Sequence, residues 1–127
     1  MAAFASRMVI PGVLLAFTLA SGIWLHHLGR PLTVALFTVH KLIALVLVIC
    51  ASVSVYHLCK GTSLRALVVG ALVVTGLLFL ALFVTGALLN TAKVAHAALF
   101  TSHRLLSVLA VISATVTTYL LASGRSS

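Results

Sequence analysis

The 127-residue chain contains no aspartate and no glutamate. The missing carboxylates exclude hydrolysis by paired acids, carboxylate sites for Mg²⁺ or Ca²⁺, and proton relays built from acidic side chains. Charged residues of any kind make up only 6% of the sequence, whereas they make up about a quarter of an ordinary soluble domain. The chain therefore has no polar coat for a surface in water, and we expect a single domain, residues 1–127, embedded in lipid.

Cysteine is also scarce, with two residues and no CxxC pattern. We expect Cys50 to fill space within a helix, and the spacing alone does not pair it with Cys59. The eight lysines and arginines give a net charge of +8, but they are scattered singly, which argues against nucleic acid as a partner. Anionic lipid headgroups, or the acid groups of a bound cofactor, are the expected counterions.

Apolar residues are abundant, at 63% of the chain. They form runs long enough to span a bilayer, which takes roughly 20 residues. The expected spans are residues 8–28, 32–58, 64–89 and 94–122. Because the connections are short, neighbouring helices must be antiparallel, and the sequence predicts an all-α, up-down four-helix transmembrane bundle.

The cations near the ends of these spans predict an orientation. On the side that carries both termini lie Arg7, Lys60, Arg65 and Arg125, and on the opposite side lie Arg30 and Lys93. Positive residues are favoured on the cytoplasmic side. We therefore expect both termini in the cytoplasm and the histidine-rich end on the other side of the membrane.

Two stretches of the chain are nearly the same, "ALFTVHKL" from Ala35 and "ALFTSHRL" from Ala98. Without a gap, residues 35–56 and 98–119 share 11 identities in 22 positions. The most specific matches are Phe37/Phe100, Thr38/Thr101, His40/His103 and Tyr56/Tyr119. With one residue gapped, "ASG" ending at Gly22 also matches "VTG" ending at Gly86. These matches predict a duplicated helix hairpin, with halves at about 8–58 and 66–122 related by an approximate two-fold axis along the membrane normal.

The duplication predicts that His40 and His103 lie at matching depth, each about ten residues and so roughly 15 Å beyond its loop. A lone membrane histidine often makes only a helix–helix hydrogen bond, worth about 1 kcal/mol or less. A symmetric pair that faces the bundle axis is instead what a haem with two histidine ligands requires. We therefore predict one haem b, with His40 and His103 as its axial ligands.

A cation follows each predicted ligand, and the chain has no carboxylate to pair with it. Lys41 and Arg104 either extend to the headgroups or neutralise the haem propionates. Gly22 and Gly86 occupy corresponding places on the first and third spans, where small residues let a helix approach a neighbour or the edge of a haem.

Other polar residues within the spans give weaker indications of function than the matched histidines. His57 is aligned with Leu120, so a second haem lacks its second histidine. Ser54 and Thr117 are expected to bond carbonyls of their own helices, with a proton or quinone path as the alternative.

Three further histidines, His26, His27 and His96, are expected near the surface that the haem approaches. They are polar interface residues, a labile metal site, or the place where an electron partner or quinone docks. They match no structural zinc pattern.

With four spans, and with "VHK" and "SHR" at matched depth, the chain resembles the small four-helix membrane cytochromes of the b type. The resemblance implies a haem-binding subunit that anchors an oxidoreductase and passes electrons between a quinone and a partner protein. The chain differs from the di-haem families, which carry two histidines on each ligand helix. Since it has neither an acid nor an evident nucleophile, we expect an electron relay within a larger redox complex rather than a complete enzyme.

Two other functions remain open from the sequence. One is a haem-free structural subunit whose histidines and cations contact neighbouring chains or lipids. The other is a small metal or solute permease built on the same repeat, with His26, His27 and His96 as its entry site.

Overall fold

The structure is a computed structural model that describes residues 2–28, 34–60, 63–91 and 97–124. Nearly all of these residues are helical, in α1 (Ala2–Leu28), α2 (Val34–Cys59), α3 (Ala66–Thr91) and α4 (Ala97–Ser123). All four helices are long and apolar enough to cross a membrane. The predicted fold class, an all-α chain with four membrane-spanning helices, is confirmed.

Each of the four helices extends beyond its predicted apolar run at one end. α1 begins at Ala2 instead of residue 8, because the alanine-rich segment before the run has a high helix propensity. α3 covers Ala66–Thr91 instead of residues 64–89. α2 and α4 each end one residue later than predicted, at Cys59 and Ser123. The predicted starts of the second and fourth spans, residues 32 and 94, lie outside the described residues.

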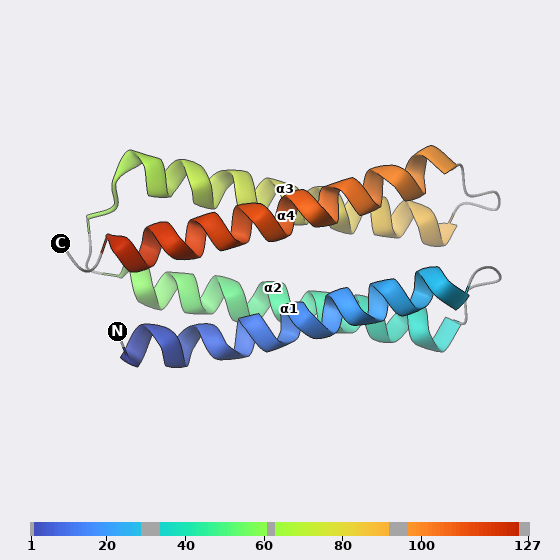
Figure 1. Ribbon diagram of the computed structural model, residues 1–127, viewed down its shortest axis with the longest axis horizontal. Helices are drawn as coiled ribbons and strands as arrows, with labels where there is room; N and C mark the ends of the chain where they lie inside the picture. The colour runs from blue at the N-terminus through green and yellow to red at the C-terminus, as the bar shows by residue number, and fades with distance from the viewer. Residues whose placement is uncertain (1, 29–33, 61–62, 92–96, 125–127) are drawn as a thin grey trace. The chain divides into compact units, whose positions relative to one another are not determined.

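The chain divides into two compact units, Met1–Thr62 and Ser63–Ser127. The first unit is a hairpin of α1 and α2, and the second is a hairpin of α3 and α4 (Figure 1). The hydrogen bonds of the first hairpin show that its helices are antiparallel. Ser54, near the end of α2, bonds to Arg7, near the start of α1. His40, near the start of α2, bonds to Ser21, near the end of α1.

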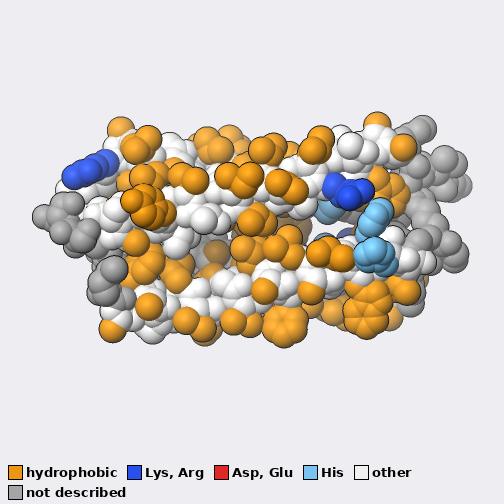
Figure 2. Space-filling model, in the orientation of Figure 1, with side chains coloured by type: hydrophobic (Ala, Val, Ile, Leu, Met, Phe, Trp, Pro, Cys, Tyr) orange, Lys and Arg blue, Asp and Glu red, His pale blue; other side chains and the backbone are white. Residues whose placement is uncertain are grey.

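The surface of the helices is apolar. Large hydrophobic side chains are exposed along all four helices, and Figure 2 shows them spread over the visible face. Trp24, Tyr56 and Tyr119 are exposed as well, as expected of aromatic residues at a membrane interface. A surface of this kind fits lipid rather than water as its surroundings.

Buried apolar residues occupy equivalent positions in the two hairpins. A shift of 64 residues relates α1 to α3, and a shift of 63 relates α2 to α4, as the sequence alignment requires. Under these shifts three pairs of buried residues coincide, Leu25 with Leu89, Leu47 with Ala110, and Leu58 with Leu121. Buried Val68 and Pro11 are instead aligned with the half-buried Phe4 and Thr75. The two hairpins thus share three buried positions.

A proline within α1 leaves one carbonyl without its usual helical partner. Pro11 has no N–H, so it cannot donate to the carbonyl of Arg7 one turn earlier. The hydroxyl of Ser54 on α2 donates to that carbonyl at 3.1 Å. A side chain of the second helix therefore satisfies a backbone group that the first helix cannot.

The structure describes only some of the cations from which the membrane orientation was predicted. Arg7, Lys60 and Arg65 are exposed. Arg30, Lys93 and Arg125 lie outside the described residues.

Candidate functional site

The first hairpin brings His40 of α2 against two consecutive residues of α1. Ser21 Oγ lies 2.8 Å from His40 Nδ1, and the serine is buried. Gly22 follows it, and a Cβ atom there would lie 3.3 Å from His40 Cε1, closer than side chains usually pack. The absence of a side chain at Gly22 therefore lets the imidazole lie against the α1 backbone. We call Ser21, Gly22 and His40 the first histidine cluster.

The second hairpin repeats this arrangement with a different hydroxyl residue. Thr85 Oγ1 on α3 lies 2.7 Å from His103 Nδ1 on α4. A Cβ atom at Gly86 would lie 3.6 Å from His103 Cε1, an ordinary contact distance. We call Thr85, Gly86 and His103 the second histidine cluster. Both predicted ligand histidines are thus half-buried and held by the neighbouring helix of their own hairpin.

The hydroxyls of Ser21 and Thr85 were not predicted as site residues. The sequence did contain a signal for them, because each immediately precedes a matched glycine, in "ASG" and in "VTG". Gly22 and Gly86 were predicted to pack at the edge of a haem. In the structure each lies next to the imidazole of its own hairpin.

The two cations that follow the histidines differ in their surroundings. Lys41 is half-buried, and its Nζ atom lies 4.5 Å from the centre of the Phe37 ring, one turn earlier on α2. Its side chain therefore points toward the start of α2, the direction in which headgroups and propionates are both expected. Arg104 is exposed.

The remaining histidines do not join either cluster in the described part of the chain. His26 and His27 are exposed in the last turn of α1, with ring centroids 5.9 Å apart. His96, predicted to lie near them, is outside the described residues. His57 is exposed with its ring edge-on to Tyr56. Among the described residues no three histidines, cysteines or acids are grouped in a way that could hold a metal ion.

The prediction that Ser54 and Thr117 bond their own helices is wrong. Ser54 donates to the Arg7 carbonyl of α1. Thr117 Oγ1 lies 3.3 Å from the Ala71 carbonyl of α3 and 2.9 Å from Thr75 Oγ1. Both residues face the partner helix, and their hydroxyls bond across the hairpin because polar groups of that helix lie within reach.

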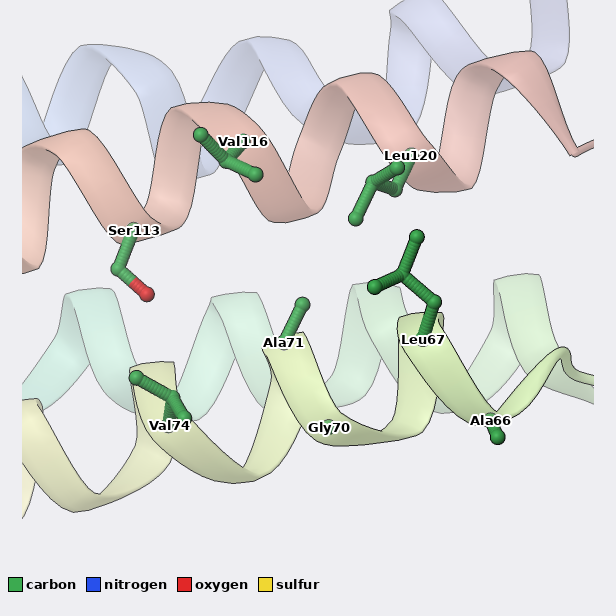
Figure 3. Close-up of a pocket in the computed structure, with 8 residues that line it drawn as sticks. All are labelled: Ala66, Leu67, Gly70, Ala71, Val74, Ser113, Val116 and Leu120. Atoms are coloured by element: carbon green, nitrogen blue, oxygen red, sulfur yellow. The ribbon is translucent and has the colours of Figure 1, made fainter.

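An apolar cleft of about 460 Å³ lies between α3 and α4. Leu67 and Leu120 face each other across it, and Ser113 supplies its one side-chain hydroxyl (Figure 3). That hydroxyl already bonds Thr75 Oγ1 at 2.6 Å. Ser113 follows His103 by about ten residues, roughly 15 Å along the helix, so the cleft is separate from the second histidine cluster.

No family model, curated protein or solved structure matches the chain. The two histidine clusters are therefore the features on which a function rests.

Proposed function

We propose that the chain is a membrane-embedded b-type cytochrome, in which His40 and His103 ligate a single haem that relays electrons within a larger redox complex. The observation that carries this proposal is the hydroxyl group bonded to Nδ1 of each histidine. Histidines that ligate metals are typically oriented by a hydrogen bond at the nitrogen that faces away from the metal. With Nδ1 occupied in this way, Nε2 is the nitrogen that would bind iron.

The residues present fit such a group. Imidazole nitrogens suit iron, and a haem takes two axial ligands, one for each of its faces. Because Gly22 has no side chain, the His40 imidazole lies close to the backbone of α1. A bound haem would supply the electron chemistry, while the chain would bind it, orient it and exclude water.

The surrounding residues have supporting roles in the proposal. Lys41 and Arg104 would neutralise the propionates, since the chain has no acid for them to pair with. His26 and His27, exposed at the end of α1, would face the electron partner or quinone. Both termini would be cytoplasmic, with the haem nearer the opposite face of the membrane.

The proposal includes a duplicated hairpin whose two copies form one four-helix bundle around the haem. Equivalent hydrogen bonds support the duplication. The bond between Ser21 and His40 corresponds to that between Thr85 and His103. Likewise, the contact of Ser54 with the Arg7 carbonyl corresponds to that of Thr117 with the Ala71 carbonyl.

Absorption spectroscopy tests the proposal directly. The chain is purified in detergent, supplied with haemin, and its spectrum is recorded before and after reduction with dithionite. We expect a sharp α-band in the reduced protein that His40→Ala and His103→Ala each abolish. The matched control is His57→Ala, which changes an exposed histidine outside both clusters and should leave the band intact. A folded wild-type chain that stays colourless overturns the proposal.

One observation favours a second candidate, a haem-free structural subunit. The same hydroxyl–imidazole bonds join the two helices of each hairpin, which is a role that membrane histidines can fill without any metal. This candidate predicts a colourless chain whose thermal unfolding temperature in detergent falls in His40→Ala and His103→Ala.

A further inference from the structure

The hydroxyl group of Ser21 has its single proton engaged elsewhere. Ser21 Oγ donates to the backbone carbonyl of Thr18, one turn earlier on α1, at 3.0 Å. A hydroxyl carries one hydrogen and two lone pairs. With its proton placed there, the hydroxyl accepts from His40 Nδ1, so the hydrogen in the 2.8 Å bond belongs to the imidazole. The Thr18 carbonyl is also a hydrogen-bond partner of the His40 ring.

Thr85 is arranged in the same way in the other hairpin. Its Oγ1 donates to the carbonyl of Ala81 at 2.9 Å and also lies 3.2 Å from that of Leu82. Its proton is thus directed along α3, and the 2.7 Å bond to His103 Nδ1 again takes its hydrogen from the imidazole.

We infer that Ser21 and Thr85 are positioning residues that keep a hydrogen on Nδ1 of both histidines, so that in the neutral imidazole the lone pair lies on Nε2. A neutral imidazole carries one N–H, so assigning it to Nδ1 assigns the acceptor to Nε2. The tautomer is thereby set by the protein before any ligand binds.

A further consequence rests on the proposed function. When Nδ1–H donates a hydrogen bond, the imidazole becomes a stronger electron-pair donor to a metal at Nε2. A stronger donor favours ferric over ferrous iron. Ser21 and Thr85 would therefore lower the midpoint potential of the haem and tighten its binding.

The tautomers are measured on the haem-free protein by ¹⁵N NMR with labelled histidine. We expect Nδ1–H signals from His40 and His103 in the wild type. Ser21→Ala should move His40 alone toward the Nε2–H form, and Thr85→Val should move His103 alone. Ser21→Thr and Thr85→Ser keep a hydroxyl group and should preserve the wild-type signals.

Matched controls remove hydroxyl groups that do not touch a histidine. Ser6→Ala lies on α1, where the hydroxyl donates to the Ala3 carbonyl of its own helix. Thr91→Val lies on α3, where the hydroxyl lies 3.3 Å from each of the carbonyls of Ala87 and Leu88. Both controls should leave the tautomers unchanged. The inference is overturned if the wild-type protein gives Nε2–H signals. It is also overturned if Ser21→Ala and Thr85→Val leave the tautomers of His40 and His103 unchanged.

Haem-loaded protein then tests the consequence for the metal. Ser21→Ala and Thr85→Val should each raise the midpoint potential and weaken haem binding by about tenfold or more. A chain with Nδ1–H histidines that binds no haem refutes the proposed cytochrome and leaves the tautomer assignment intact. A haem protein with the opposite tautomer refutes the assignment and leaves the cytochrome intact.

Discussion

At the scale of single residues, the two glycines beside the histidines leave different amounts of room. A Cβ atom at position 22 would lie 3.3 Å from the imidazole carbon of His40, whereas one at position 86 would lie 3.6 Å from that of His103. The first distance requires the ring to move by a few tenths of an ångström, and the second is an ordinary contact. The two halves of the chain should therefore respond differently to the same substitution.

We predict that Gly22→Ala weakens haem binding and that Gly86→Ala has little effect. Displacing the His40 ring strains its bond to Ser21 and costs about 1 kcal/mol, which corresponds to roughly a fivefold loss of affinity. Titration of the haem-free protein with haemin, followed by absorbance, measures the difference. Equal affinities for the two variants would contradict the packing described here.

At the scale of the helices, the proline of α1 creates a dependence between two residues on different helices. Pro11 leaves the Arg7 carbonyl without an amide donor, and the Ser54 hydroxyl takes that place. In the second hairpin Thr75 is aligned with Pro11, and its N–H is available to the Ala71 carbonyl. Thr75 Oγ1 also donates to that carbonyl at 2.8 Å. Only the first hairpin therefore depends on a single hydroxyl at this point.

We predict that Ser54→Ala destabilises the chain by about 1 kcal/mol, the cost of an unsatisfied carbonyl. Pro11→Thr restores the missing amide, so Ser54→Ala should cost much less when Pro11→Thr is also present. Thr117→Val, at the aligned position, should cost less than Ser54→Ala. Thermal unfolding in detergent, followed by circular dichroism, measures the stability of the two single variants and the double variant. Additive effects of Ser54→Ala and Pro11→Thr would rule out the dependence of the Arg7 carbonyl on Ser54.

The helices were predictable because their apolar runs exceed the thickness of the bilayer, a constraint that needs no tertiary information. The contacts between them were harder to predict. Periodicity places Ser54 and Thr117 on a face of a helix, but it does not say which residue of the neighbour lies opposite. That depends on the register of each hairpin, and so the carbonyls of Arg7 and Ala71 were not foreseen as their partners.

The histidine clusters were predictable in part for a related reason. The repeated motif identified His40 and His103 as a matched pair, and its upstream match identified the glycines. The hydroxyl contacts to Nδ1 depend on side-chain placement at distances of 2.7–2.8 Å, which sequence spacing does not resolve.

At the scale of the whole chain, the proposal requires one haem that both hairpins share. We predict one haem per chain, and we predict that either His40→Ala or His103→Ala removes all of the α-band, because each variant leaves only one axial ligand. Haem content per chain and the spectra of the two variants measure this. Half of the wild-type absorbance remaining in each variant would mean that the histidines serve separate haems.

The two histidine clusters share no residue, and each is formed by the two helices of one hairpin. In the proposed cytochrome, a mutation in one histidine cluster would therefore change the surroundings of one ligand histidine and leave those of the other unchanged. Serine at position 21 and threonine at position 85 are one such divergence. Natural selection would then be able to adjust the affinity of this carrier for an electron in small independent steps, one face at a time.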